Sequence, residues 1–172
     1  GKSLLISMLE NYYDVRKADE FNRLFGQLAI GQNPTPRHNR YFILRWNFSV
    51  VETAGDIEHV RQMLYDHLNS AIYQFIRRYE GMFTFNIEIH PTNALATFQS
   101  LLANIETTPY PLYLFIDEYD NFANKVLMAQ RTDSQERYLE LVEGEGLLRT
   151  LFQSIKYALE GQGLERVFIT GV

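Results

Sequence analysis

The sequence of 172 residues contains no cysteine. Disulfide frameworks, thiolate zinc sites and cysteine nucleophiles are therefore excluded together. Because reduced, disulfide-free chains are typical of the cytosol, we predict a cytoplasmic protein.

Basic charge and long apolar runs are also scarce. The chain has 16 Lys and Arg against 21 Asp and Glu, a formal net charge of −5, so no global basic field favours nucleic acid. A local basic patch stays open as an alternative. No apolar run approaches the roughly 18 residues of a membrane span, and the first residues meet acid and Tyr too soon for a signal peptide. We therefore expect a soluble domain that does not bind membranes.

Apolar and aromatic residues are plentiful and follow clear periods. Hydrophobic residues make up 46% of the chain, with 12 Phe and 11 Tyr, which is enough for one dense core. Spacings of three and four residues predict helices, and short apolar runs predict buried strands. The predicted helices are 2–17, 21–28, 57–79, 94–105 and 147–159, and the predicted strands are 40–50, 111–120 and 165–172.

The segments between these elements are polar or broken. Residues 31–39 predict a loop, residues 82–89 either a short strand or an extended connection, and residues 121–145 helical pieces. Within the last segment, "ELVEGEG" is interpreted as a solvated acidic turn. Because helices alternate with apolar strands, we predict a single α/β domain over residues 1–172, with a parallel sheet covered on both faces.

One predicted strand ends in acids. "YLFIDEYD" places Asp117 and Glu118 at the carboxyl end of a buried run, which is the edge where open α/β sheets bind ligands. In phosphate-loop enzymes the first acid holds Mg²⁺ and a following Glu can activate water. The bland alternative is a strand that ends in solvated acids, which is common.

The chain opens on "GKS", the last three positions of the phosphate-binding loop G-x-x-x-x-G-K-[ST]. Such a tripeptide alone is weak evidence, but it begins a predicted helix and precedes the acid-tipped strand. A third strand, "RVFIT", ends at Thr170. In this arrangement Lys2 suits the phosphates of a nucleotide, Ser3 suits Mg²⁺, and Thr170 suits a γ-phosphate sensor.

Three stretches, "GKSLLISMLENYY", "LFIDEYDN" and "VFITGV", resemble the AAA-ATPase-like family, and the likeness covers most of the chain. The resemblance implies a P-loop NTPase three-layer fold that uses ATP and Mg²⁺. It gives Gly1, Lys2 and Ser3 a phosphate role, Asp117 a metal role, Glu118 a water-activating role and Thr170 a sensor role. Asn47 is a departure, because the family often has Asp there.

Family members often carry a restriction-endonuclease-like domain further along, so we expect a C-terminal nuclease-like domain in the full-length protein. We also expect the 172 residues to be a fragment truncated at both ends. The resemblance would place the missing first, central strand between the strands of Asp117 and Thr170, so we predict a gap in the sheet there. Such a piece is expected to bind nucleotide poorly.

The remaining candidates receive structural interpretations. The four histidines (His38, His59, His67 and His90) are scattered and predict surface or satisfied side chains rather than a metal site. Arg77-Arg78 suits a solvated helix end better than an arginine finger or a nucleic-acid contact. Tyr119 and Asp120 are expected to order the acidic edge, and no Ser-His-acid arrangement can be argued from spacing.

The sequence thus predicts Mg²⁺-dependent ATP hydrolysis coupled to a partner domain. The alternative is a catalytically degenerate nucleotide fold that acts as a scaffold or interaction module. Oligomerisation is open, and ATP is preferred over GTP on the family resemblance alone.

Overall fold

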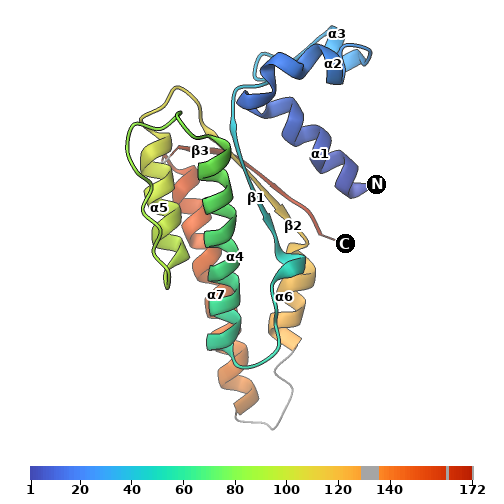
Figure 1. Ribbon diagram of the computed structural model, residues 1–172. Helices are drawn as coiled ribbons and strands as arrows, with labels where there is room; N and C mark the ends of the chain where they lie inside the picture. Colours follow the sequence, from blue (N-terminus) through green and yellow to red (C-terminus); the bar gives the residue numbers. More distant parts are fainter. Residues whose placement is uncertain (129–135, 162, 172) are drawn as a thin grey trace.

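The computed structural model describes residues 1–128, 136–161 and 163–171. Figure 1 shows the helices and strands in chain order. The elements are α1 (Lys2–Tyr13), η1 (Val15–Glu20), α2 (Phe21–Phe25), α3 (Ala29–Gln32), β1 (Phe42–Asn47), η2 (Phe48–Val50), α4 (Ile57–Arg78), α5 (Ala94–Ile105), β2 (Leu112–Asp117), α6 (Tyr119–Met128), α7 (Glu136–Leu159) and β3 (Leu164–Ile169).

The three strands form a parallel sheet in the order β1-β2-β3. All six residues of the central strand β2 are buried, which explains its continuous apolar sequence. The register pairs Asn47 with Asp117, so the carboxyl ends of β1 and β2 coincide. The predicted α/β class and parallel pairing are confirmed, and all three strands end at one edge of the sheet.

The gap predicted between β2 and β3 is wrong, because these two strands are direct hydrogen-bonded neighbours. Leu114 pairs with Val167, and Ile116 pairs with Ile169. The ladder continues past β3, where the Thr170 N–H donates to the Ile116 carbonyl at 2.8 Å. A strand buried on both faces needs a partner for its main-chain groups on each side. This pairing places Thr170 directly beside the end of β2.

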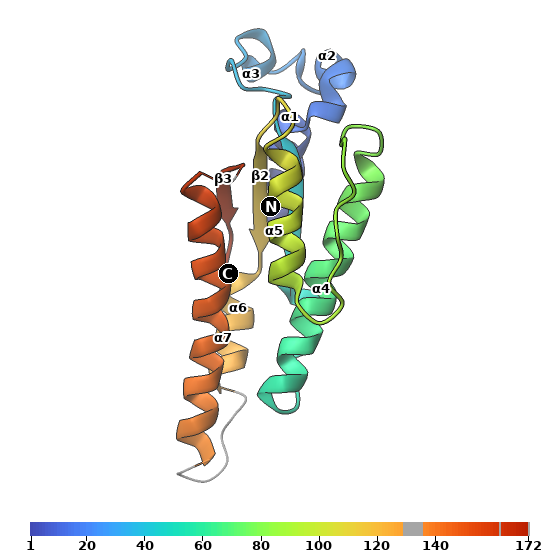
Figure 2. The ribbon, with the colours of Figure 1, turned by 90° about the vertical axis from the view of Figure 1, so that its left-hand side faces the viewer.

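Helices cover both faces of the sheet, as predicted. In Figures 1 and 2, α4, α5 and α7 lie over one face, and α1 lies over the other. Alternating strand residues divide between the two layers. Leu44 and Leu114 pack in the large core with α4, α5 and α7, whereas Ile43 and Phe115 pack with Ile6 of α1.

The first helix is shorter than predicted. It ends at Tyr13 because Asp14 adopts an extended backbone, with ψ of 123°, and forms a bridge with Tyr41. The Asp14 side chain then accepts from the Arg16 N–H and starts the 3₁₀ helix η1. An Asx side chain that bonds its own neighbouring amide offers the backbone an alternative to helix, and here the alternative prevails.

The interpretation of "ELVEGEG" as a turn is wrong, because residues 140–146 lie inside α7. A Cβ on Gly144 would lie 3.2 Å from the Val126 Cγ1 atom. Gly144 therefore allows α7 to approach α6 closely, so this glycine serves packing rather than chain reversal.

Other boundaries follow the same logic of local capping. The predicted strand 40–50 ends early at Asn47, where η2 begins. Residues 82–89 form an irregular connection with bends rather than a strand, and α3 takes the first residues of the predicted loop 31–39. The helices predicted at 57–79 and 94–105 are confirmed as α4 and α5.

None of the helices in the described ranges combines the length and the apolar character that crossing a bilayer requires.

Candidate functional site at the carboxyl edge of the sheet

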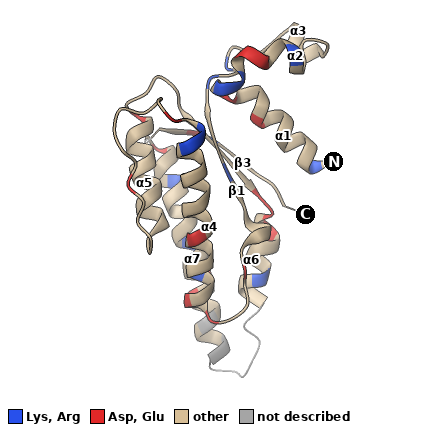
Figure 3. Cartoon of the chain, viewed as in Figure 1, with Lys and Arg blue, Asp and Glu red and all other residues tan. Residues whose placement is uncertain are grey.

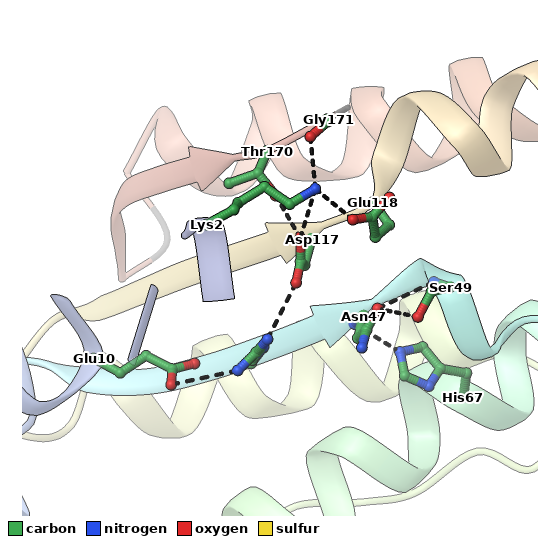
Figure 4. Close-up of polar contacts among 10 residues, drawn as sticks. Lys2, Glu10, Asn47, Ser49, His67, Asp117, Glu118, Thr170 and Gly171 are labelled. Atoms are coloured by element: carbon green, nitrogen blue, oxygen red, sulfur yellow. Dashed lines mark hydrogen bonds and ion pairs between the residues drawn. The ribbon is translucent and has the colours of Figure 1, made fainter. Parts of the chain in front are cut away.

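Asp117 lies at the centre of a polar cluster where β2 ends (Figure 4). Its side chain is only 7% exposed, and each carboxylate oxygen has its own donor. The Thr170 hydroxyl donates to Oδ1 at 2.6 Å, and the Arg45 guanidinium donates to Oδ2 at 3.1 Å. Burial alone would raise the pKa of Asp117, but the hydrogen bonds from Thr170 and Arg45 and the charge of Lys2 outweigh it and lower the pKa. Asp117 is therefore an ionised, oriented carboxylate at neutral pH.

Lys2 reaches this cluster from the first turn of α1. Its Nζ atom donates to the Glu118 carboxylate and, at 2.7 Å, to the Gly171 carbonyl. The same atom lies 3.8 Å from Asp117 Oδ1. The hydrogen bond to Glu118 raises the pKa of Lys2 above its ordinary value. The ammonium group thus lies between the two acids that the sequence singles out.

Glu118 has a left-handed backbone, with φ of 59°. This conformation is uncommon for a residue with a side chain, and it costs on the order of 1–3 kcal/mol where the surroundings enforce it. It turns the chain from β2 into α6, and the Tyr119 N–H then donates to the Thr170 carbonyl at 3.2 Å. The turn directs the Glu118 carboxylate toward Lys2, as Figure 4 shows. This main-chain contact ties the start of α6 to the residue that follows β3, and an ordering role of the Tyr119 side chain stays a prediction.

Asp120 lies beside Gly171, which follows Thr170 at the end of the sheet. A Cβ on Gly171 would lie 2.6 Å from Asp120 Cγ, so only glycine fits against this carboxylate without a shift. The Asp120 side chain also accepts from the Asn121 N–H at 2.9 Å. Asp120 therefore packs at the acidic edge where the sequence analysis expects it.

Gly1 and Ser3 are at the same edge but outside the contact network. Both residues are exposed, and Gly1 has open space around it. Among the hydrogen bonds of the described residues, none involves the Ser3 hydroxyl. The structure therefore gathers Lys2, Asp117, Glu118 and Thr170, and it leaves Gly1 and Ser3 facing solvent.

Arg45 and Glu10 are members of the cluster that the sequence analysis missed. Arg45 Nη1 lies 3.7 Å from Glu10 Oε2, and Nη2 bonds Asp117. Burial raises the pKa of Glu10, against the opposing effect of Arg45. The available signal was the single charged residue inside the apolar run "YFILRWNF", because a charge in a buried strand requires a partner.

Asn47 and His67 have structural partners at the neighbouring strand end. Asn47 Oδ1 accepts from the Ser49 N–H at 3.1 Å and from the Ser49 hydroxyl at 2.7 Å, so it caps η2. The Asn47 N–H donates to His67 Nε2 at 3.1 Å. His67 is thus the satisfied histidine that the sequence analysis favours, and Asn47 does not point its amide at Asp117.

Arg77 and Arg78 are exposed at the last turn of α4. Arg78 donates to the Ile43 carbonyl at 3.5 Å, near the amino-terminal half of β1 and away from the acidic edge. A solvated helix end is therefore the better description. Figure 3 shows basic and acidic residues interspersed over the helices and strands rather than segregated by sign.

The oxygen donors at this edge suit Mg²⁺. No group of three or more metal-ligating side chains occurs within the part of the chain that the structure describes. Nucleotide-bound Mg²⁺ takes only one or two protein carboxylates or hydroxyls, with water and phosphate oxygens for the rest. The oriented carboxylate of Asp117 and the free hydroxyl of Ser3 fit that donor set.

A known protein family matches the whole chain. The family model of the AAA-ATPase-like proteins, described as "Predicted AAA-ATPase", matches residues 1–172. The chain belongs to this family. No curated protein and no solved structure matches the chain significantly. An AAA-ATPase-like family implies the use of ATP, and the three-stranded α/β architecture is compatible with a nucleotide-binding fold.

Proposed function

We propose that this AAA-ATPase-like domain binds ATP with Mg²⁺ and hydrolyses it at the carboxyl edge of the sheet. One observation carries the proposal. Lys2, Asp117, Glu118 and Thr170 come from three separated stretches of the chain, and hydrogen bonds and ion pairs join all four side chains into one cluster. A strand that merely ends in solvated acids would not gather a lysine from residue 2 and a threonine from residue 170.

Lys2 is the phosphate-binding group in this proposal. Its ammonium already lies at the N-terminus of α1, where main-chain amides and the helix dipole also favour an anion. The contacts with Glu118 and Gly171 must give way when a phosphate binds. Nucleotide binding would therefore free the Glu118 carboxylate from Lys2.

Asp117 and Ser3 are the residues that would hold Mg²⁺. When bound, the ion would neutralise the negative charge that develops on the phosphate oxygens during hydrolysis. Asp117 is suited to this role because its lowered pKa keeps it ionised and its donors hold it in one orientation. Ser3 has a hydroxyl without a competing hydrogen bond among the described residues.

Glu118 and Thr170 complete the chemistry. Once released from Lys2, the Glu118 carboxylate can accept a proton from the attacking water as that water bonds to the γ-phosphorus, while the bond from the γ-phosphorus to the bridging oxygen breaks and ADP leaves. Thr170 is the γ-phosphate sensor in this proposal, and its hydroxyl bond to Asp117 links that sensor to the metal site. Rearrangement of Glu118 and of the segment after β3 would pass the state of the nucleotide to an attached partner domain.

Steady-state ATP turnover by the full-length protein tests this proposal. Lys2→Ala and Glu118→Gln are compared with the wild type and with two exposed controls, Lys125→Ala and Glu106→Gln. Loss of a positioned general base is expected to lower the rate of turnover about 10²–10⁴-fold, while the controls keep wild-type turnover. Turnover that neither site variant changes would overturn the residue assignment.

The alternative is a degenerate nucleotide fold that acts as a scaffold. Absent turnover in the wild type, with partner binding that does not respond to nucleotide, would favour that alternative. The cytoplasmic location, the nuclease-like partner domain and any oligomer remain parts of the proposal, and fractionation and sizing of the full-length protein address them.

A further inference from the structure

We infer that Arg45 is a positioning residue that sets the orientation of the Asp117 carboxylate for the metal, and that Glu10 holds Arg45 in place. The inference rests on the proposed function, because it concerns the same site. It assigns roles to two residues on β1 and α1 that lie outside the phosphate loop and outside the acidic strand end.

The geometry divides the two oxygens of Asp117 between two neighbouring strands. Thr170, directly after β3, donates to Oδ1, and Arg45 of β1 donates to Oδ2. Lys2 approaches the Oδ1 side, at 3.8 Å. Arg45 thereby engages the oxygen away from Lys2, and Oδ1 is left on the side where the phosphates would bind. A carboxylate with a donor on each oxygen cannot rotate about χ2 without breaking one of these bonds.

The sheet register explains why Arg45 can reach Asp117. Arg45 pairs with Phe115, and Asp117 follows two residues later on the same face of β2. That face is the one covered by α1, because Phe115 and Ile43 pack with Ile6. Arg45 therefore lies in a partly buried layer, 33% exposed, where a hydrogen bond to a carboxylate is stronger than in water.

Glu10 supplies the second contact of the same guanidinium. Its Oε2 atom lies 3.7 Å from Nη1, whereas Nη2 bonds Asp117. A planar guanidinium can serve two carboxylates on separate nitrogens, but the compact ammonium of lysine cannot span both in this geometry. Glu10 and Lys2 both belong to α1 and lie about 12 Å apart along the helix axis. Two points of α1 are thus tied to one acid on β2, which fixes the phosphate-binding lysine relative to the metal ligand.

The test separates a positioning role from a merely structural one. A fluorescent ATP analogue is titrated into the full-length protein, first with EDTA and then at increasing Mg²⁺ concentrations. The variants are Arg45→Gln, Arg45→Lys and Glu10→Gln, with the exposed Arg23→Gln as the matched control. Far-ultraviolet circular dichroism checks that each variant is folded.

Loss of an outer partner of a metal ligand typically costs 10–100-fold in metal affinity. We therefore expect Arg45→Gln to raise the Mg²⁺ concentration at half-saturation by about 10–100-fold, while the affinity measured in EDTA stays within about twofold of wild type. Arg45→Lys should restore part of the loss, and Glu10→Gln should have a smaller effect of the same kind. Arg23→Gln should match the wild type in both conditions.

Two results would overturn the inference while leaving the proposed function standing. One is a wild-type Mg²⁺ dependence in folded Arg45→Gln, or in Arg45→Lys if the Gln variant does not fold. The other is a parallel weakening with and without Mg²⁺, which would mark a structural role only. A wild-type protein that shows no Mg²⁺-dependent binding of the analogue would instead overturn the proposed function, and the inference with it.

Discussion

Tyr79 offers a quantitative test of how the outer strand β1 is held against α4 and the end of α1. Its ring is fully buried at the end of α4, and its hydroxyl has two partners. The hydroxyl donates to Asp14 Oδ1 at 2.8 Å and accepts from the Ile43 N–H at 3.0 Å. Tyr79 thus joins α4 to β1 and to the residue that ends α1.

Tyr79→Phe removes only the hydroxyl and leaves both partners in a dry environment. A buried polar group that loses its partner costs about 1–3 kcal/mol. Asp14 keeps the hydrogen bond from the Arg16 N–H, so the cost of leaving Asp14 without Tyr79 lies at the lower end of this range. We therefore expect the free energy of unfolding to fall by about 2–4 kcal/mol. For a chain of this size that loss corresponds to a decrease in Tm of about 5–15 °C.

Urea denaturation monitored by circular dichroism measures this loss, with Tyr73→Phe as the matched control. Tyr73 lies on the same helix with half of its side chain exposed, so its substitution should change stability by no more than about 0.5 kcal/mol. Equal midpoints for Tyr79→Phe and Tyr73→Phe would refute the account of a shared buried network.

Three further outcomes can be measured in the same way. Gly163→Ala should lower the free energy of unfolding by about 1–3 kcal/mol, because φ is +87° and the new Cβ would lie 2.9 Å from a side chain of α5. Gly146→Ala in α7 meets open space and should raise the free energy of unfolding by up to about 1 kcal/mol. Equal melting temperatures of the two variants would contradict this difference. Asp56→Ala should lower stability by about 0.5–2 kcal/mol, since Asp56 caps α4, and unchanged helicity and Tm would contradict the cap. Burial lowers the pKa of His67 below its ordinary 6.5. The stabilisation of the folded state by the neutral His67 imidazole is therefore complete above pH 6.5 and is lost as pH falls through the pKa of the folded state. Between about pH 7 and pH 5 the wild type should therefore lose more stability than His67→Gln, and parallel pH profiles would argue against the bond to Asn47.

Periodicity predicted most of the architecture, because the long elements bury one continuous stripe. The residues of α4 that face the core recur every three or four positions, and the six residues of β2 are uniformly buried. Neither pattern has a competing interpretation of similar strength. Two boundary errors, at Asp14 and Asn47, lie where one side chain decides where an element ends. The carboxylate of Asp14 and the amide oxygen of Asn47 accept hydrogen bonds from nearby main-chain N–H groups.

Sequence reasoning found the acids, the lysine and the threonine of the candidate site because each stands at the end of a predicted element. It missed Arg45, which lies inside a strand and acts across the sheet rather than along the chain. It also missed the direct pairing of β2 with β3, because strand order depends on contacts between distant segments. Both omissions concern lateral neighbours, which hydrophobic periodicity does not encode.

The identity of the nucleotide retained by Glu118→Gln tests the central claim most directly. The full-length variant is incubated with radiolabelled ATP and Mg²⁺, separated from free nucleotide and analysed for bound ATP and ADP. The account predicts that Glu118→Gln holds intact ATP, whereas the wild type holds ADP and Lys2→Ala retains little of either. A variant that holds ADP and turns ATP over at the wild-type rate would contradict the account.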